Sequence, residues 1–284
     1  MTNKSIRIRS MGIFPRLVLH LFIYALTAMW LVPVIIALVT AFRSNSEIIA
    51  NGFWSLPKTL TLNNFAEAWT RGGLEHYLPN TFIITVPSVI ATLFFSSLGA
   101  YSLARFRFRA DRVILFIFVA GMLLPFQILL LPVFRLMNVL GIYNTYWALI
   151  IFHTSFQLGF CTFVMRNYMR TVPGEILEAA RIDGCGEFRV YWRIMLPLTL
   201  PAIGALATLE FTWIFNDFLW ALILLQRMEY MPVTTGLAAL QGQYVMDWTV
   251  IISGSLIATM PTVIVFLFLQ RYFIKGLTLG SVKG

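Results

Sequence analysis

Two acidic residues, Glu210 and Asp217, stand within an otherwise apolar stretch of the chain. They are seven residues apart, about two turns, so on one helix they would point in nearly the same direction. A carboxylate inside a membrane is costly unless it is paired or hydrated. We therefore expect both to face a watery cavity or a neighbouring helix, and not lipid.

Aromatic and amide side chains lie near these carboxylates in the sequence or on a neighbouring apolar stretch. Carboxylate and amide oxygens accept hydrogen bonds from hydroxyl groups, and an indole ring stacks against a CH-rich face. Such a set suits a polar, hydroxyl-bearing solute. The alternative is structural, with Glu210 and Asp217 bonding to a neighbouring helix or gating a path. The candidate substrate-pathway residues are Glu210, Trp213, Asn216, Asp217, Trp220 and Gln157.

The sequence carries no signature of an enzyme active site. It has no G-x-x-x-x-G-K-[ST] phosphate loop and no soluble stretch of domain length that would house one. The two cysteines, Cys161 and Cys185, are far apart, and the three histidines are isolated, so no metal-ligand spacing arises. We expect no catalytic residue, metal or cofactor on this chain. A membrane-embedded enzyme, for example a lipid-modifying one, remains an alternative without a nucleophile and base to support it.

These residues belong to an all-α, polytopic membrane protein. Only 12% of the 284 residues are charged, whereas a soluble domain has about a quarter. Apolar runs of about 20 residues, enough to cross the hydrocarbon core as a helix, alternate with short charged segments. We expect six spans, a permease core at 81–270 and an external segment at 43–80. The spans are placed at 17–42, 81–104, 113–136, 146–165, 201–225 and 250–270.

The distribution of positive charge orients the chain. Sixteen of the 21 lysines and arginines fall at 1–16, 105–112, 166–200 and 271–284, and five fall in the intervening segments. The positive-inside rule places both termini in the cytoplasm. The net charge of +9 follows from this bias, and no basic face with interleaved aromatic residues indicates nucleic-acid binding.

The cytoplasmic segment 171–200 is too polar to cross a membrane and too regular to be a plain loop. Pro173 and Glu175 suit the start of a helix, and the pair Asp183 and Gly184 suits its end. A second short helix with apolar Phe188, Tyr191, Trp192 and Ile194 is expected before Pro197 and Pro201 redirect the chain. From the residues alone this is a helix parallel to the membrane, either docking a partner or simply lying in the interface.

The stretch EAARIDGCGEFRVYWRIMLPLTLP at 178–201 resembles the EAA loop of bacterial ABC importer permeases. The stretches LLPFQILLLPVFRLMNVLGIYNTYWALII (123–151), FNDFLWALILL (215–225) and RYFIKGLTLGSVKG (271–284) resemble the carbohydrate, maltose-type subfamily. The likeness covers about 81–284 well. It implies a type I ABC importer permease fold with a cytoplasmic coupling helix, in the bacterial cytoplasmic (inner) membrane. The positions that match the family pattern are Glu178, Ala179, Ala180, Gly184 and the pair Leu196 and Pro197. With the neighbouring charges, the expected ATPase-coupling residues are Glu178, Ala179, Ala180, Arg181, Asp183, Gly184 and Pro197.

The resemblance also implies partners and a mechanism. Two ATP-binding subunits, holding ATP and Mg, would receive the coupling helices of this chain and of a second homologous permease. An external solute-binding protein would deliver a sugar, and the spans would alternate in access. The tail residues Gly280, Ser281 and Lys283 would contact the ATPase. Alternatives are a non-sugar or acidic solute, or an ion-coupled secondary transporter that uses Glu210 and Asp217 as a relay.

Overall fold

The computed structural model describes residues 12–243 and 247–279, and this part of the chain is helical with no strand. Five helices are long and apolar enough to cross a membrane, and a sixth span arises if one sharply bent pair is counted together. The expected all-α polytopic fold is therefore confirmed. The helices that match expected spans are α1 (Ile13–Ala41), α4 (Leu74–Arg105), α7 (Tyr146–Met169), α10 (Leu196–Phe215) and α13 (Trp248–Leu279).

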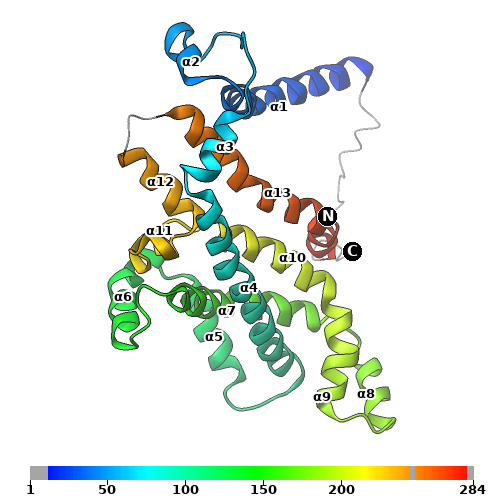
Figure 1. The fold of residues 1–284 in the computed structure, drawn as a ribbon. Coiled ribbons are helices and arrows are strands. Elements are labelled where there is room, and N and C mark those ends of the chain that lie inside the picture. The colour runs from blue at the N-terminus through cyan, green and yellow to red at the C-terminus, as the bar shows by residue number, and fades with distance from the viewer. Residues whose placement is uncertain (1–11, 244–246, 280–284) are drawn as a thin grey trace.

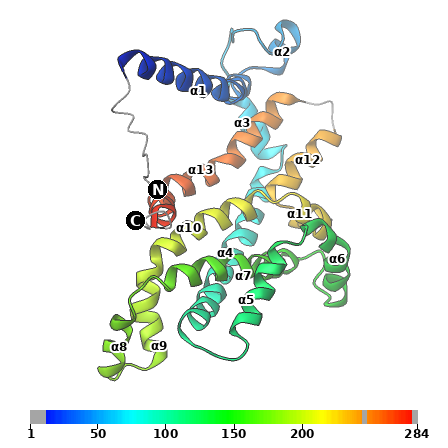
Figure 2. The same cartoon turned by 180° about the vertical axis from the view of Figure 1, so that it is seen from behind.

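The centre of the molecule is formed by α4, α7 and α10, which cross in both views of the fold (Figures 1 and 2). Helices α4 and α7 run in the same direction, because Ser96 contacts Leu158 and Arg105 contacts Met169. The face of α4 in this core carries small hydroxyl residues. Such residues let membrane helices approach closely, where large side chains would hold them apart. The buried hydroxyl residues of α4 are Thr81, Thr85, Ser88, Thr92, Ser96 and Ser97.

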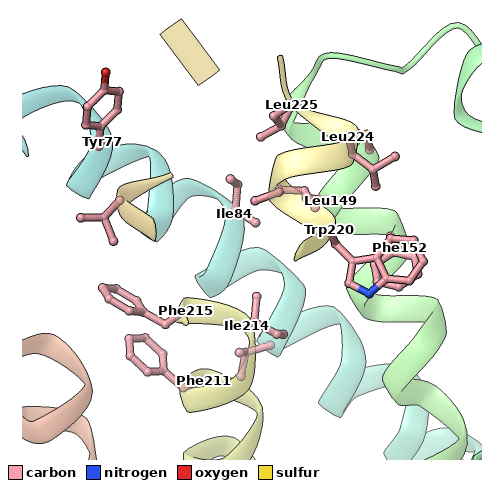
Figure 3. Packing of buried hydrophobic residues seen from close by; sticks show 14 of the residues in the cluster. Tyr77, Ile84, Leu149, Phe152, Phe211, Ile214, Phe215, Trp220, Leu224 and Leu225 are labelled. Carbon is pink, nitrogen blue, oxygen red and sulfur yellow. The ribbon is translucent and has the colours of Figure 1, made fainter. Parts of the chain in front are cut away.

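Two apolar clusters hold the ends of this core. Figure 3 shows the first, where Ile84 of α4 lies near Leu149 of α7, Phe211 and Phe215 of α10 lie side by side, and Trp220 of the short helix α11 (Leu219–Leu224) packs on Phe152. The second lies around Tyr101, Met165 and Tyr191 and includes one face of α8 (Gly174–Ile182). The two clusters therefore fix both ends of the central helices.

The segment 43–80 is a folded unit, not an extended loop. It contains α2 (Asn45–Asn51), α3 (Asn63–Thr70) and the first turns of α4. Arg43 is fully buried, and its guanidinium donates to Glu47 at 3.1 Å and to the carbonyl oxygens of Phe53 and Gly52. Backbone and side-chain groups thus satisfy the buried charge. The two figures place α2 and α3 at the end of the molecule opposite α8.

The expected third span, 113–136, is not one continuous helix. The structure has α5 (Asp111–Met122), a 3₁₀ turn at Phe126–Leu129 and α6 (Leu130–Val139), with a bend of 97° between the two arms. Pro125 lies at the break, because proline lacks an N–H and disfavours a helical conformation in the preceding residue. Pro132 sits in the first turn of α6 and does not interrupt it.

The expected fifth span, 201–225, also differs. A helical run begins at α9 (Glu187–Val190), passes through a π-helical segment at Tyr191–Met195 and continues as α10 to Phe215. Pro197 therefore lies inside this run, and the expectation that Pro197 and Pro201 redirect the chain is wrong. The wide π turn ends two residues before Pro197, whose missing N–H would break a regular helical ladder.

The remaining connection at the α2 end contains a 3₁₀ turn at Met228–Tyr230 and α12 (Val233–Gln243). α12 packs against α4 and α13. Helix α1 contrasts with the rest, since its buried residues are Thr40 and Ala41 and its apolar surface is otherwise exposed or half-exposed. Both figures show α1 projecting from the core, as expected for a helix whose surface faces lipid or another protein.

Candidate functional site

The helix α8 lies outside the membrane core and presents two different faces. Its inner face is anchored by Leu177 and Ala180, which are 2% and 8% exposed and belong to the second apolar cluster. Its outer residues Glu178, Ala179 and Arg181 are exposed. The structure therefore separates the predicted coupling residues. Ala180 faces inward and anchors the helix, and its neighbours form the free surface.

The end of α8 is set by Gly184, which has a left-handed backbone with φ of +80°. This conformation lets the N–H of Gly184 donate to the Arg181 carbonyl and the N–H of Cys185 donate to the Ala180 carbonyl. A β-carbon on Gly184 would meet no atom within 4 Å. Glycine is therefore required here by backbone conformation and not by packing. Asp183, just before it, is exposed.

The charge at the end of α8 is paired. Arg181 Nε donates to Glu187 Oε1 at 2.7 Å, and Arg181 Nη2 donates to Oε2 at 3.3 Å. The hydrogen bond with Glu187 raises the pKa of the Arg181 guanidinium, so Arg181 remains a cation. Both side chains are about two-fifths exposed, at 39% and 44%. The exposed surface of α8 thus combines the carboxylates Glu178 and Asp183 with a fixed cation.

The other predicted coupling and tail residues lie elsewhere. Pro197 is the second residue of α10 and is exposed on that helix, beyond the π-helical segment. The predicted tail contacts Gly280, Ser281 and Lys283 lie outside the described residues. The exposed candidates on and directly after α8 therefore form the surface that the structure brings together.

Glu210 and Asp217 do not lie on one helix, because α10 ends at Phe215. Both nevertheless face α7. The Cys161 thiol donates to Glu210 Oε1 at 3.1 Å, and Asp217 Oδ2 lies 3.5 Å from His153 Nε2. Glu210 is fully buried, so of the two expected environments the structure gives it the neighbouring helix.

Asp217 also has a local structural role. Its carboxylate accepts hydrogen bonds from the backbone N–H groups of Trp220 and Ala221, at 3.3 and 3.0 Å. An acidic residue in this place satisfies the free donors at the start of a helix and suits its positive end. The Asp217 carboxylate therefore caps the start of α11, which follows directly after the end of α10.

A hollow of about 590 Å³ lies between α5, the break after it and α7. Among the predicted pathway residues, Gln157 and Trp213 line it. Trp213 is 46% exposed, and the centroid of its ring lies 5.5 Å from that of Phe160. None of the lining residues is charged. They are Ile117, Phe118, Gly121, Met122, Leu124, Phe126, Leu129, Ser155, Phe156, Gln157, Leu158, Gly159, Phe160 and Trp213.

The other four predicted pathway residues do not line this hollow: Glu210 and Asp217, described above, and Trp220 and Asn216. Trp220 is 4% exposed and packs on Phe152, with ring centroids 3.8 Å apart. Asn216 is exposed and its amide donates to the Thr212 carbonyl. No group of three metal-ligating side chains occurs among the residues that the structure describes.

Sequence reasoning missed several residues of these sites. The aromatic residues Phe118 and Phe126 lie on either side of the break at Pro125, and Phe160 of α7 lines the same hollow. No periodicity in the sequence indicates that these three rings meet. Glu187 is paired with the end of α8, and no role was expected for it from the sequence. The sequence shows only that Glu187 follows Gly184 by three residues, which places a carboxylate close to the end of α8.

Similar proteins agree with this architecture. Permease protein AraQ of an arabinooligosaccharides transport system in Halalkalibacterium halodurans is 37% identical over 255 residues, covering 89% of this chain and 91% of that protein. The melibiose/raffinose/stachyose import permease protein MelC of Bacillus subtilis is 31% identical over 254 residues, covering 89% of this chain and 91% of that protein.

Solved structures show the same fold. A chain in the crystal structure of a bacterial ABC transporter involved in the import of the acidic polysaccharide alginate is 26% identical, with a TM-score of 0.78. The match covers 96% of this chain and 99% of that one. The profile of the family described as binding-protein-dependent transport system inner membrane component matches residues 93–279, which include α7, α8 and α10. The chain therefore belongs to the family of inner membrane components of binding-protein-dependent transport systems.

Proposed function

We propose that this chain is the permease subunit of an ATP-binding-cassette importer that carries a sugar or oligosaccharide across the cytoplasmic membrane by alternating access. ATP, with Mg, is hydrolysed on two separate subunits that dock on α8 and on the equivalent helix of a second permease. An external solute-binding protein delivers the solute. The observation that carries this proposal is α8, a short helix anchored on one side and exposed on the other.

The anchoring of α8 suits the transmission of force. A partner that pulled on Glu178, Ala179 or Asp183 would act on a helix whose inner residues pack against the core. A helix that merely floated in the membrane interface would turn a broad apolar face to lipid, as amphipathic interfacial helices do. The free face of α8 instead mixes charged and small residues with only two exposed apolar side chains, Ile176 and Ile182, and such a mixed surface suits a protein cleft.

The rest of the assembly follows from what this chain lacks and exposes. Its sequence has no phosphate loop, so ATP hydrolysis is assigned to a partner. The exposed apolar surface of α1 is where lipid and the second permease would lie. Counting positive charges assigns the end that holds α8 and the 105–112 connection to the cytoplasm, together with both termini.

The hollow beside α7 favours a neutral sugar. Trp213 and Phe160 offer rings for the CH faces of a pyranose or furanose, and Gln157 offers both donors and acceptors for hydroxyls. Relatives named for arabinooligosaccharides and for melibiose, raffinose and stachyose support this class. The similarity to the alginate importer supports a second candidate, an acidic oligosaccharide. Because the hollow is uncharged, cations for that solute would have to come from the second permease.

The first test is reconstitution. The chain is expressed with its second permease, ATP-binding subunits and binding protein, purified as a complex and placed in vesicles. We expect the ATP-binding subunits to co-purify and uptake to be inhibited by vanadate. Uptake that an uncoupler abolishes and that proceeds without ATP would instead establish a secondary transporter. A panel of labelled arabinotriose, raffinose, maltotriose and oligo-alginate identifies the solute class.

The second test addresses the hollow. Trp213→Ala should raise the KM for uptake about threefold to tenfold, since one ring contact contributes roughly 0.5–1.5 kcal/mol, and Trp213→Phe should retain most of the affinity. The matched control is Trp30→Ala on α1, where the ring is 76% exposed. Equal KM values for Trp213→Ala and Trp30→Ala would remove the hollow from the solute path.

A further inference from the structure

We propose that Tyr101, Glu187 and Arg181 form a linkage that makes α8 move as one body with α4. The inference rests on the proposed docking of an ATPase on α8, and it assigns positioning roles to two residues outside the docking surface. Glu187 is the hub, Arg181 connects it to the end of α8, and Tyr101 connects it to the long helix α4.

The geometry of the hub joins segments that are far apart in the chain. The Tyr101 hydroxyl donates to Glu187 Oε2 at 2.8 Å, and Arg181 donates to both carboxylate oxygens, with the shorter bond at 2.7 Å. Hydrogen bonds that involve an ionised group are shorter and stronger than neutral ones. One carboxylate therefore holds α8 and α4 at once.

A second contact fixes the same part of α4 one turn earlier. The Ser97 hydroxyl donates to the Phe94 carbonyl at 2.8 Å, so its oxygen is free to accept the hydrogen of the Tyr191 hydroxyl, which lies 2.6 Å away. The Tyr101 and Tyr191 rings are 5.3 Å apart, and both side chains are nearly buried. Glu187 and Tyr191 thus bring the start of the α9–α10 run against α4.

The connection between α8 and α9 explains why such a linkage is needed. It contains Gly184 and Gly186, and neither would meet an atom within 4 Å through an added β-carbon. A connection with this freedom would absorb a displacement of α8 by rotating its backbone. The bidentate pair between Arg181 and Glu187 bypasses the two glycines, so the displacement reaches α4 and α10 directly.

Tyr101→Phe is the decisive variant. It removes one hydroxyl and keeps the ring that packs on Tyr191, and the 5% exposure of Tyr101 leaves it no face for the ATPase. The complete complex in vesicles is assayed for ATP hydrolysis and for import of labelled arabinotriose, raffinose or maltotriose, whichever the wild-type complex carries. We expect normal assembly and a fall in sugar imported per ATP of about threefold to tenfold, the range that a typical intramolecular hydrogen bond supports.

Glu187→Gln provides a second variant, because it keeps the shape of the hub and removes the charge that holds Arg181. We expect a similar fall, and the double variant Tyr101→Phe with Glu187→Gln should fall no further than the lower single variant. Matched controls are Tyr24→Phe on α1, where the tyrosine is 68% exposed, and Glu67→Gln on α3. Both controls should keep the wild-type ratio.

The outcomes separate this inference from the proposed function. A wild-type complex that imports sugar without ATP hydrolysis overturns both. A coupled wild-type complex with wild-type ratios in Tyr101→Phe and Glu187→Gln overturns the linkage alone. Variants that assemble poorly but transport a normal amount of sugar per ATP also overturn it, because that pattern shows only structural support.

Discussion

Substitutions of Gly184 can distinguish backbone strain from a clash with a docking partner. Its φ is +80°, and an added β-carbon would lie in open space. Gly184→Ala therefore creates no clash, and its cost is the strain of an L-residue in the left-handed region, roughly 1–2 kcal/mol. Such a cost reduces the population of the native turn about fivefold to thirtyfold.

Gly186 offers a matched control two residues away. It also faces open space, but its φ of −68° and ψ of 156° are an extended conformation that any residue adopts. Gly186→Ala should therefore change stability by no more than about 0.5 kcal/mol. Gly184→Asn should lie between the two alanine variants, because asparagine enters the left-handed region more readily than alanine.

The assay uses the reconstituted complex and measures the ATP hydrolysis that the liganded binding protein stimulates, together with the amount of ATPase retained on purification. Gly184→Ala should lower the stimulated rate about fivefold or more, the effect of 1 kcal/mol or above, and Gly186→Ala should match the wild type. If the two alanine variants behave alike, the backbone argument for Gly184 is refuted.

Gly184→Trp then tests the docking surface itself. The indole would extend into open space, so this chain should insert in the membrane as well as Gly184→Ala does. If Gly184→Trp binds less ATPase than Gly184→Ala does, the additional loss indicates that the ATPase approaches this turn closely. Equal binding by the Trp and Ala variants would mean that no partner approaches this turn.

Two more predictions concern the end of the molecule opposite α8. The backbone N–H of Lys58 donates to the Glu47 carboxylate and holds the pKa of Glu47 below its ordinary value of 4.5. The stability that this carboxylate gives the segment 43–80 is therefore present above pH 4.5 and is lost as the pH falls through the lowered pKa. Limited proteolysis across this pH range should show the loss, and a wild-type pH profile in Glu47→Gln would contradict it. Gly236→Ala should destabilise the protein by about 1–3 kcal/mol, because a β-carbon there would overlap the Tyr77 ring. In thermal unfolding, adding Tyr77→Ala should recover part of the lost stability, and Gly121→Ala, where an added β-carbon meets no atom, should lose none. An unchanged unfolding midpoint in Gly236→Ala would refute the overlap.

Much of this protein could be predicted from its sequence, because the deciding forces are local. A run of about 20 apolar residues must form a helix in lipid, since no water satisfies its backbone there. α7 accordingly runs from Tyr146 to Met169, close to the expected 146–165. α8 likewise ends at Ile182, directly before Asp183 and Gly184, as the sequence indicates, because the left-handed turn is a property of the glycine itself.

Contacts between helices could not be predicted in this way. Pro125 indicates a break in the helix, but the 97° bend between α5 and α6 depends on what packs against each of these helices. Tyr101 and Glu187 are 86 residues apart, and no local pattern pairs them. Ala180 turns inward and Trp213 turns toward the hollow because of how α8 and α10 are rotated on the core. Those rotations are set by the summed packing of many side chains on several helices, so only the tertiary structure decides which polar and aromatic residues meet.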